Sequence, residues 1–545
     1  MHSTEDQRLG RFYTPDSLAA FVLALALEGR RAHRLWDPTC GDGSFLRAAS
    51  GRATQLVGTD LDEVAVRTLA AQLPEAHLTV TELFSVERAE LGTFDAIVGN
   101  PPFLRTERVP PSQRAHMRAR VTEATGVSIP GSVDTSLLAL AWCCRFLRPG
   151  GRLAFVLPAT ALDVASGAGL RRWIATHHHV QWVVDSQVEP WFLNAAVNTV
   201  VVLVEAAPPG PTRFVRLRAP VCAQLGLDLL EDTVREVRTL PPSALETPRW
   251  SPLLRAPEVW FELLEAAGDR LVSLGQRLRL AYGTKPGISA FFAPRPPPDV
   301  EEHHLRPFLR TLRHQSRYRV LPEHTEDRLF VVPPGEALGP RAAAWVAEGA
   351  ERTSRRGVPY PEVPSVKGNT PWWRLPEPRS GPVLLPQFRA ARHHVLDNPE
   401  QLPVNNSAWH GTWHTPSHHG VGVGLLNASL MALGAEVLGR TNLGEGLLTL
   451  YGPELRALPM PDPGLYEGDA ADAVRCAWKE MAGRDVLPFA EEARREDRRR
   501  LDTATLRGLG LPGELAEPIA SAAVALLHTR ERLATERRAR LASTP

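Results

Sequence analysis

The segment DPTCGDGSFL, residues 37–46, joins a short β-type run to the start of a helical pattern. Gly41 and Gly43 within it allow a tight turn and let a ligand approach the backbone closely. The next β-type run ends in GTDLD and places Asp60 at its carboxyl end. A carboxylate there can accept hydrogen bonds from both hydroxyls of a ribose, as in nucleotide-binding folds generally. The spacing is not that of the dinucleotide Gly-x-Gly-x-x-Gly motif, so no pyrophosphate cradle is expected.

Outward from this segment, β-type runs alternate with helical patterns between residues 34 and 205. The β-type runs cover 34–36, 55–59, 77–80, 95–99, 152–158, 180–185 and 198–205, and the helical patterns cover 62–72, 134–147 and 160–175. Strands rich in Val, Ile and Leu with helices between them are typical of a mostly parallel sheet covered on both faces. We therefore expect an α/β fold with a seven-stranded, mostly parallel, Rossmann-like sheet.

The segment TELF, residues 81–84, follows the third β-type run. Glu82 at that strand end can accept a hydrogen bond from an adenine amino group, and Leu83 and Phe84 can pack against the ring. A solvated loop carboxylate explains Glu82 equally well when it is taken alone. Its place after Asp60 in the series of strand ends favours a role in nucleotide binding.

The segment GNPPF, residues 99–103, ends the fourth β-type run and is the most informative in the chain. Pro101 and Pro102 make a stiff extended turn, which leaves the Asn100 side-chain oxygen and the Pro101 carbonyl free to point at one spot. Two rigid acceptors on the hydrogens of a planar exocyclic amine draw the nitrogen lone pair out of conjugation and towards an electrophilic methyl group. Phe103 offers a face on which a base flipped out of duplex DNA can stack.

Together these motifs resemble the gamma class of DNA adenine-N6 methyltransferases, the TaqI-like enzymes of restriction–modification systems. The resemblance implies S-adenosyl-L-methionine as cofactor and the N6 amine of a flipped adenine as methyl acceptor. It assigns Asn100, Pro101, Pro102 and Phe103 to catalysis, and Tyr13, Thr14, Pro15, Asp37, Cys40, Gly41, Gly43, Asp60, Leu61, Glu82 and Leu83 to the cofactor. Two positions depart from the family pattern, because Glu82 stands where Asp is usual and Phe103 where Tyr is commoner. The second change keeps the stacking face and loses only a hydroxyl.

The resemblance continues beyond residue 205 with weaker motifs. Three segments resemble parts of the family's target-recognition domain, namely 282–292, 386–398 and 426–463. We expect a catalytic methyltransferase domain over 1–205, an α+β target-recognition domain over 206–465 and a helical C-terminal region over 466–545. A second aromatic ring near the flipped base is expected at Trp191 or Phe192, although a core position suits either ring equally well.

Composition and charge narrow the class of protein. The formal net charge is +1, so a face that binds nucleic acid must be local. No apolar run reaches the about 18 residues of a membrane span, and residues 1–15 lack the apolar core of a signal peptide. The five cysteines show neither paired metal spacing nor a disulfide framework, which predicts a reducing, cytoplasmic location.

Two charged or polar clusters carry a weaker signal. Four histidines lie close together in a stretch rich in Gly, Pro and Ser, namely His410, His414, His418 and His419. We interpret them as loop residues and predict no metal ligands. The charged run at 491–502 alternates in sign and predicts a solvated helix face.

Double-stranded DNA is the expected partner, with a separate cognate restriction endonuclease or other defence-system subunits acting beside the enzyme. An RNA or protein-glutamine methyltransferase is an alternative, because Asn-Pro-Pro-aromatic motifs also activate planar amides and guanine amines. The Thr-Pro segment at 14–15 and the long C-terminal extension argue against it. A cytosine-N4 enzyme shares the amine chemistry, but Asn rather than Ser at position 100 favours adenine. The intact Asp37, Asp60 and Asn100 disfavour a catalytically inactive DNA-binding subunit.

Overall fold

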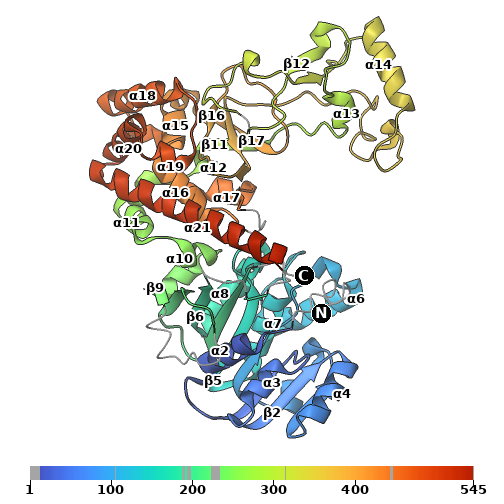
Figure 1. Cartoon of the computed structure of the whole chain (residues 1–545), viewed down its shortest axis with the longest axis vertical. Coiled ribbons are helices and arrows are strands. Elements are labelled where there is room, and N and C mark those ends of the chain that lie inside the picture. Colours follow the sequence, from blue (N-terminus) through green and yellow to red (C-terminus); the bar gives the residue numbers. More distant parts are fainter. Residues whose placement is uncertain are drawn as a thin grey trace. The chain divides into compact units, whose positions relative to one another are not determined.

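The computed structural model describes most of the chain, namely residues 13–104, 106–186, 191–192, 198–221, 234–313, 315–441 and 446–543. Figure 1 labels many of its helices and strands. The chain divides into two compact units. The first consists of Met1–Ala256 with Thr535–Pro545, and the second of Pro257–Ala534.

A mixed sheet forms the centre of the first unit, and its nine described strands have the order β3-β2-β1-β4-β5-β7-β6-β8-β9. The strands are β1 Ala32–Asp37, β2 Ala53–Asp60, β3 Ala76–Val80, β4 Phe94–Gly99, β5 Leu147–Pro158, β6 His179–Ser186, β7 Thr199–Glu205, β8 Thr212–Leu217 and β9 Val234–Leu240. Neighbours from β3 through β5 are parallel, whereas β7 is antiparallel to both β5 and β6. Strand β6 is parallel to β8, and β8 is antiparallel to β9.

The prediction of a seven-stranded, mostly parallel sheet needs correction. Each of the seven predicted β-type runs falls on a strand, but β8 and β9 extend the sheet beyond residue 205, where the catalytic domain was predicted to end. The connection over 206–211 is short, and Phe214 and Leu217 of β8 are buried. The N-terminal stretch of the first compact unit runs from Met1 to Ala256 and includes both of these strands.

Helices cover both faces of this sheet. They are α2 Asp16–Leu27, α3 Ser44–Ala49, α4 Glu63–Gln72, α5 Arg88–Leu91, α6 Pro111–Thr125, α7 Thr135–Cys143, α8 Ala168–His177 and α10 Ser251–Arg255, with 3-10 turns η1 Leu83–Ser85, η2 Thr106–Arg108, η3 Cys144–Phe146, η4 Ala159–Leu162, η5 Ala165–Gly167 and η6 Pro242–Glu246. On β5, Leu153 and Phe155 belong to an apolar cluster shared with α7 and α8, whereas Ala154 and Val156 belong to one shared with α2 and α3. Because side chains alternate along a strand, a strand buried on both faces appears in the sequence as a continuous apolar run.

The second unit contains a four-stranded antiparallel sheet with the order β11-β17-β14-β16. Its strands are β11 Leu278–Tyr282, β14 Val383–Pro386, β16 Leu396–Asp397 and β17 Ala408–Trp413, and smaller antiparallel pairs join β10 Leu271–Ser273 to β19 Pro459–Pro461, β12 Leu305–Pro307 to β13 Arg328–Phe330, and β15 Phe388–Arg389 to β18 Leu448–Thr449. A separate apolar cluster lies among residues 288–375. This unit is therefore of the α+β type.

Helices dominate the C-terminal part of the second unit, as predicted. The helices after Ala256 are α11 Glu258–Ala267, α12 Leu274–Arg277, α13 Ser289–Phe292, α14 Pro340–Glu351, α15 His419–Leu426, α16 Ser429–Leu438, α17 Gly452–Ala457, α18 Gly468–Ala482, α19 Phe489–Glu492, α20 Glu496–Gly508 and α21 Ala516–Ser543, with 3-10 turns η7 Gly268–Arg270, η8 Glu302–His304, η9 Pro322–His324, η10 Tyr360–Glu362, η11 Pro416–His418, η12 Pro463–Leu465 and η13 Gly513–Leu515. Residues 442–445 of the predicted segment 426–463 lie outside the described residues. In the described part of the chain, no single helix is long and apolar enough to cross a membrane, although Pro416–Leu426 with Ser429–Leu438 passes that test as a bent pair.

Two predictions for polar residues of the second unit are wrong in part. Within 491–502, Glu492 and Arg498 are buried instead of solvated. Both have internal partners, because Arg484 Nη1 lies 2.8 Å from Glu492 Oε1 and Arg498 Nη2 donates to Tyr318 Oη at 3.1 Å. Among the clustered histidines, His410 is a buried residue of β17 and not a loop residue. Alternation of sign along a helix does not distinguish internal ion pairs from solvent contacts.

Candidate active site

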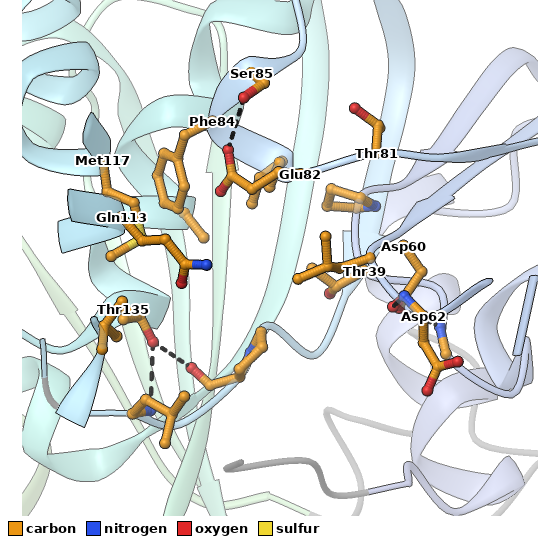
Figure 2. Close-up of a pocket in the computed structure, with 18 of the residues that line it drawn as sticks. Thr39, Asp60, Asp62, Thr81, Glu82, Phe84, Ser85, Gln113, Met117 and Thr135 are labelled. Atoms are coloured by element: carbon orange, nitrogen blue, oxygen red, sulfur yellow. Dashed lines mark hydrogen bonds between the residues drawn. The ribbon is translucent and has the colours of Figure 1, made fainter. Parts of the chain in front are cut away.

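One cavity of about 620 Å³ lies in the first unit, at the carboxyl ends of β1, β2, β3 and β4. It is lined by Tyr13, Pro38, Thr39, Gly41, Asp60, Leu61, Asp62, Ala65, Thr81, Glu82, Leu83, Phe84, Ser85, Asn100, Pro102, Leu104, Val109, Pro110, Ser112, Gln113, His116, Met117, Thr135 and Ala139. Figure 2 shows Gln113 and Met117 of α6 across the cavity from Thr39 and Asp60. Ligands of open α/β sheets bind beyond the carboxyl ends of the strands, which makes this cavity the candidate active site.

The Asp60 carboxylate ends β2 and is held by two backbone N–H groups. Gly41 donates to its Oδ2 atom at 2.8 Å, and Asp62 donates to its Oδ1 atom at 2.9 Å. Each carboxylate oxygen keeps a second lone pair for a further donor. The geometry of Asp60 therefore suits a ligand with two adjacent hydroxyl groups.

Thr59 fixes the turn after β1 to strand β2. Its hydroxyl donates to the Pro38 carbonyl at 2.9 Å and accepts the Trp36 indole N–H at 3.0 Å. Cys40 donates its backbone N–H to the Thr59 carbonyl at 3.0 Å. Trp36, Thr59 and Cys40 are all buried, so these bonds form in a low-dielectric setting where water does not compete for the same groups.

Two glycines give this turn a shape that other residues would strain. The φ angle is +48° at Gly41 and +86° at Gly43. A Cβ atom on Gly43 would lie 2.2 Å from the Leu69 side chain, whereas a Cβ atom on Gly41 would meet nothing within 4 Å. Gly43 is therefore required for the packing of α3 near α4, and Gly41 leaves its backbone open to a ligand.

Asp37 lies behind the cavity wall and does not line it. Its carboxyl is buried and accepts the Thr39 N–H at 3.2 Å on Oδ1, while Oδ2 has no hydrogen-bond partner among the described residues. Burial, reinforced by the negative charges of Asp60 and Asp42, raises the pKa of the Asp37 carboxyl well above its usual range. Burial also raises the pKa of the Cys40 thiol.

Glu82 lines the cavity from the turn after β3 and has two polar neighbours. Ser85 Oγ donates to Glu82 Oε2 at 3.1 Å (Figure 2). The His116 Nε2 atom of α6 lies 3.3 Å from Ser85 Oγ and 3.9 Å from Glu82 Oε2. Leu83 and Phe84 beside them are buried. The site thus offers a carboxylate in a defined orientation next to an apolar wall.

The GNPPF motif follows β4 and is fixed by Thr135, the first residue of α7. Thr135 Oγ1 donates to the Pro102 carbonyl at 2.7 Å and accepts the Leu104 N–H at 3.3 Å (Figure 2). The Thr135 backbone N–H donates to the Leu104 carbonyl at 2.9 Å. Asn100 and Pro102 line the cavity, and Pro101 between them is buried. The loop therefore has the rigidity that preorganised acceptors need.

Phe103 is partly buried and does not line the cavity. Its ring packs edge-on against Phe192, with centroids 6.1 Å apart and planes at 86°. Trp191 and Phe192 are each 6% exposed and belong to the apolar cluster beneath α2 and α3. The two rings expected near a flipped base thus have core contacts here, and a stacking role for Phe103 stays a prediction.

The predicted site residues divide into two groups. Those that line the cavity are Tyr13, Gly41, Asp60, Leu61, Glu82, Leu83, Asn100 and Pro102, and those that do not are Thr14, Pro15, Asp37, Cys40, Gly43, Pro101 and Phe103. The prediction missed the contribution of α6, which supplies Ser112, Gln113, His116 and Met117. The available signal was Pro111, since proline is common in the first turn of a helix.

Comparison with known proteins gives matches to a restriction-modification methylase family and to Type II methyltransferases. Residues 55–192 match a family model described as Eco57I restriction-modification methylase. The Type II methyltransferase M.TthHB8I of Thermus thermophilus is 30% identical over 274 residues, which cover 49% of this chain and 58% of that protein. The Type II methyltransferase M.PaeR7I of Pseudomonas aeruginosa is 26% identical over 317 residues, which cover 48% of this chain and 54% of that protein. The chain thus spans about half the length of the curated relatives it matches.

A solved structure, that of the type IIG restriction endonuclease BpuSI, aligns with 96% of this chain and 67% of its own, at a TM-score of 0.44 and 14% identity. The predicted resemblance to methyltransferases of restriction–modification systems is confirmed by the family match and the two Type II relatives. The matched segment includes Asp60, Glu82 and Asn100 and begins after the glycine turn.

Proposed function

We propose that this chain transfers a methyl group from S-adenosyl-L-methionine to the N6 amine of an adenine in DNA, within a restriction–modification or other defence system. The observation that carries the proposal is that Asp60, Glu82 and Asn100, from three different strand ends, line one cavity. The match of residues 55–192 to a restriction-modification methylase family supports methyl transfer to DNA. A separate nuclease or other defence subunit is the proposed partner.

The residues on the Asp60 side fit S-adenosyl-L-methionine. Asp60 would accept the ribose hydroxyls, and Glu82 would accept a hydrogen bond from the adenine amino group. The open backbone at Gly41 would let the cofactor approach closely. When bound, the cofactor supplies an electrophilic methyl group on a sulfonium.

Asn100 and Pro101 would orient the target amine. The Asn100 side-chain oxygen and the Pro101 carbonyl would each accept a hydrogen bond from one amine hydrogen and orient the nitrogen lone pair towards the methyl group that the cofactor supplies. The amine would lose one proton to solvent on methylation. Because Thr135 already holds the Pro102–Leu104 backbone, little reorganisation accompanies the reaction.

An adenine in duplex DNA must be flipped out before its amine can reach this site. Phe103 would stack on the extruded base, and its contact with Phe192 would hold the ring from the side. The choice of DNA sequence would come from residues 240–465. There the exposed rings of Tyr282 and Phe388 can contact bases. Grafting this region from a relative with another target should move the methylated sequence with it.

The decisive experiment offers labelled S-adenosyl-L-methionine together with separate pools of DNA, RNA and protein. We expect label in DNA alone, and N6-methyladenine after digestion to nucleosides. N4-methylcytosine would contradict the choice of adenine, and label confined to RNA or protein would overturn the DNA substrate. The Asn100→Ala variant serves as the control for contaminating activity.

A further inference from the structure

Two histidines and a glutamate of the second unit meet away from the candidate active site. His303 and His304 end the turn η8, and Glu336 lies in the loop between β13 and α14. His303 Nε2 is 3.2 Å from Glu336 Oε1, and His304 Nδ1 is 3.9 Å from the same oxygen. One potential ligand atom from each residue lies within 4.8 Å of the other two.

His304 has an unusual environment for a polar side chain. It is 0% exposed, and neither of its ring nitrogens has a hydrogen-bond partner among the described residues. A buried polar atom that is left unsatisfied costs about 1–3 kcal/mol. The ring centroid of Phe330 lies 6.2 Å from that of His304 in an edge-on arrangement, and this apolar ring provides no hydrogen-bond partner for the His304 nitrogens. The His304 ring nitrogens are therefore available to a ligand or ion from outside the described residues.

An ion pair between His303 and Glu336 does not account for His304, whose ring nitrogens have no hydrogen-bond partner among the described residues. The rings of His303 and His304 are only 4.1 Å apart, so both imidazoles and the Glu336 carboxylate can reach one ion. That donor set is one that a borderline transition-metal ion prefers.

We propose that His303, His304 and Glu336 bind a divalent transition-metal ion of the zinc class. Zinc binds imidazole nitrogen and carboxylate oxygen at about 2.0–2.2 Å. Tetrahedral geometry then sets neighbouring ligand atoms about 3.3 Å apart. The 3.2 Å separation of His303 from Glu336 fits this value, and a small rotation of the half-buried Glu336 side chain brings His304 into range.

The ion would act as a structural link in a loop-rich part of the second unit. The backbone of His304 is already held, because its N–H donates to the Glu301 carbonyl and its carbonyl accepts the Val331 N–H, both at 2.9 Å. Arg374 donates to the Glu336 carbonyl at 3.0 Å. Metal binding would join η8 to the loop that precedes α14, a helix that Figure 1 labels. The stability of this part would then depend on metal.

Metal titration of the full-length protein tests the proposal. Protein treated with a chelator and desalted should bind one equivalent of Zn²⁺ by calorimetry. With Co²⁺ it should develop the visible absorption of a tetrahedral or five-coordinate site. Its melting temperature should rise with free Zn²⁺, since an ion that binds only the folded state stabilises it by mass action. None of these readouts depends on methyl transfer.

Single substitutions identify the ligands. His303→Ala changes an exposed side chain and Glu336→Gln a half-buried one, so both variants should fold, whereas His304→Ala also empties a core position. The first two variants should each lose more affinity than the about 10- to 100-fold typical of losing an outer-shell partner. Glu302→Gln, an exposed carboxylate of the same turn, is the matched control and should bind like the unmodified protein. No Zn²⁺ uptake, or uptake that both ligand variants retain, would overturn the proposal.

Discussion

Gly41 donates its backbone N–H to the Asp60 carboxylate at 2.8 Å, so the turn after β1 and the end of β2 share one hydrogen bond. The same carboxylate lines the cavity together with Glu82 and Asn100. Asp60 consequently has a structural contact and a proposed ligand contact. Folding and cofactor affinity, measured on the same variants, separate the two.

Replacement of Asp60 by Ala should weaken the binding of S-adenosyl-L-methionine. Loss of charge-assisted hydrogen bonds costs about 1–3 kcal/mol, which calorimetry resolves easily. Glu63→Gln removes a nearby exposed carboxylate that pairs with Arg67 and should leave affinity unchanged. Wild-type affinity in a folded Asp60→Ala protein would rule out the ribose contact.

The two turn glycines should respond differently to alanine. Gly43→Ala should destabilise the protein by about 1–3 kcal/mol, because the new methyl group overlaps the Leu69 side chain. The new methyl group of Gly41→Ala meets no atom, so this variant should lose only about 1–2 kcal/mol of stability, the cost of a left-handed backbone conformation at a residue with a side chain. It should nevertheless bind the cofactor more weakly. Urea unfolding and calorimetry together check this contrast. Equal affinity of Gly41→Ala and the unmodified protein would show that no ligand approaches this backbone.

His116 should influence cofactor affinity through Glu82. His116→Ala removes a partner of Ser85 and should weaken cofactor binding by about 0.5–1.5 kcal/mol, the value of one neutral hydrogen bond. In a Glu82→Gln background the same change should have a smaller effect, because residues of one hydrogen-bond network are coupled. His77→Ala, an exposed histidine of β3, is the control. Strictly additive effects would place His116 outside the cofactor contact.

Asn100→Ala tests the mechanism most directly. Removal of one preorganised polar contact at a reacting centre costs about 100- to 1000-fold in rate. Cofactor and DNA should still bind, because the contacts proposed for both lie mainly at other residues. Asn100→Asp should keep partial activity, since a carboxylate still accepts from the amine. Single-turnover methylation beside a cofactor titration distinguishes these outcomes, and a near-normal rate in folded Asn100→Ala would defeat the catalytic assignment.

Glu436 should make the stability of the second unit sensitive to acid. Burial acts to raise the pKa of its carboxyl, but the hydrogen bond from His393 at 2.7 Å and the charge of Arg530 outweigh burial and lower that pKa from 4.5 to about 2. A lowered carboxyl pKa contributes stability that is fully present above pH 4.5 and is lost as the pH falls towards about 2.

Glu436→Gln should therefore cost about 3–5 kcal/mol at pH 7, as expected when one member of a buried ion pair is removed. The difference from the unmodified protein should shrink below pH 4.5. Urea unfolding at pH 7 and pH 3 measures both values. Glu348→Gln is the control, because Glu348 is exposed and pairs with Arg352. This change should alter the free energy of unfolding by less than about 1 kcal/mol. A constant difference across this range would contradict the assigned pKa.

The strands and their ends were predictable because the sheet is buried on both faces. Continuous apolar runs such as 198–205 mark such strands, and Asp60, Glu82 and Asn100 each stood at or just after the end of one. Position in a series of strand ends therefore carried more information than any single residue did. Asp60, Glu82 and Asn100 were placed at one edge for this reason.

The parts that escaped prediction depend on tertiary contacts. Helix α6 carries few apolar residues, with only Met117 and Val121 buried, so its contribution to the cavity left no periodic signal. Strand β8 follows a proline-rich connection that is typical of a linker. Arg498 is buried because its partners, Tyr318 among them, come from distant parts of the sequence.

Thr59 has a further consequence for ligand association. Its hydroxyl already uses one donor and one acceptor role to hold Pro38 and Trp36, so the turn has its final shape before any ligand arrives. The conformational entropy of this turn is lost during folding and not during association. A cofactor that binds at Gly41 should consequently associate with little chain ordering, and differences in affinity among variants of the turn should appear mainly in the dissociation rate.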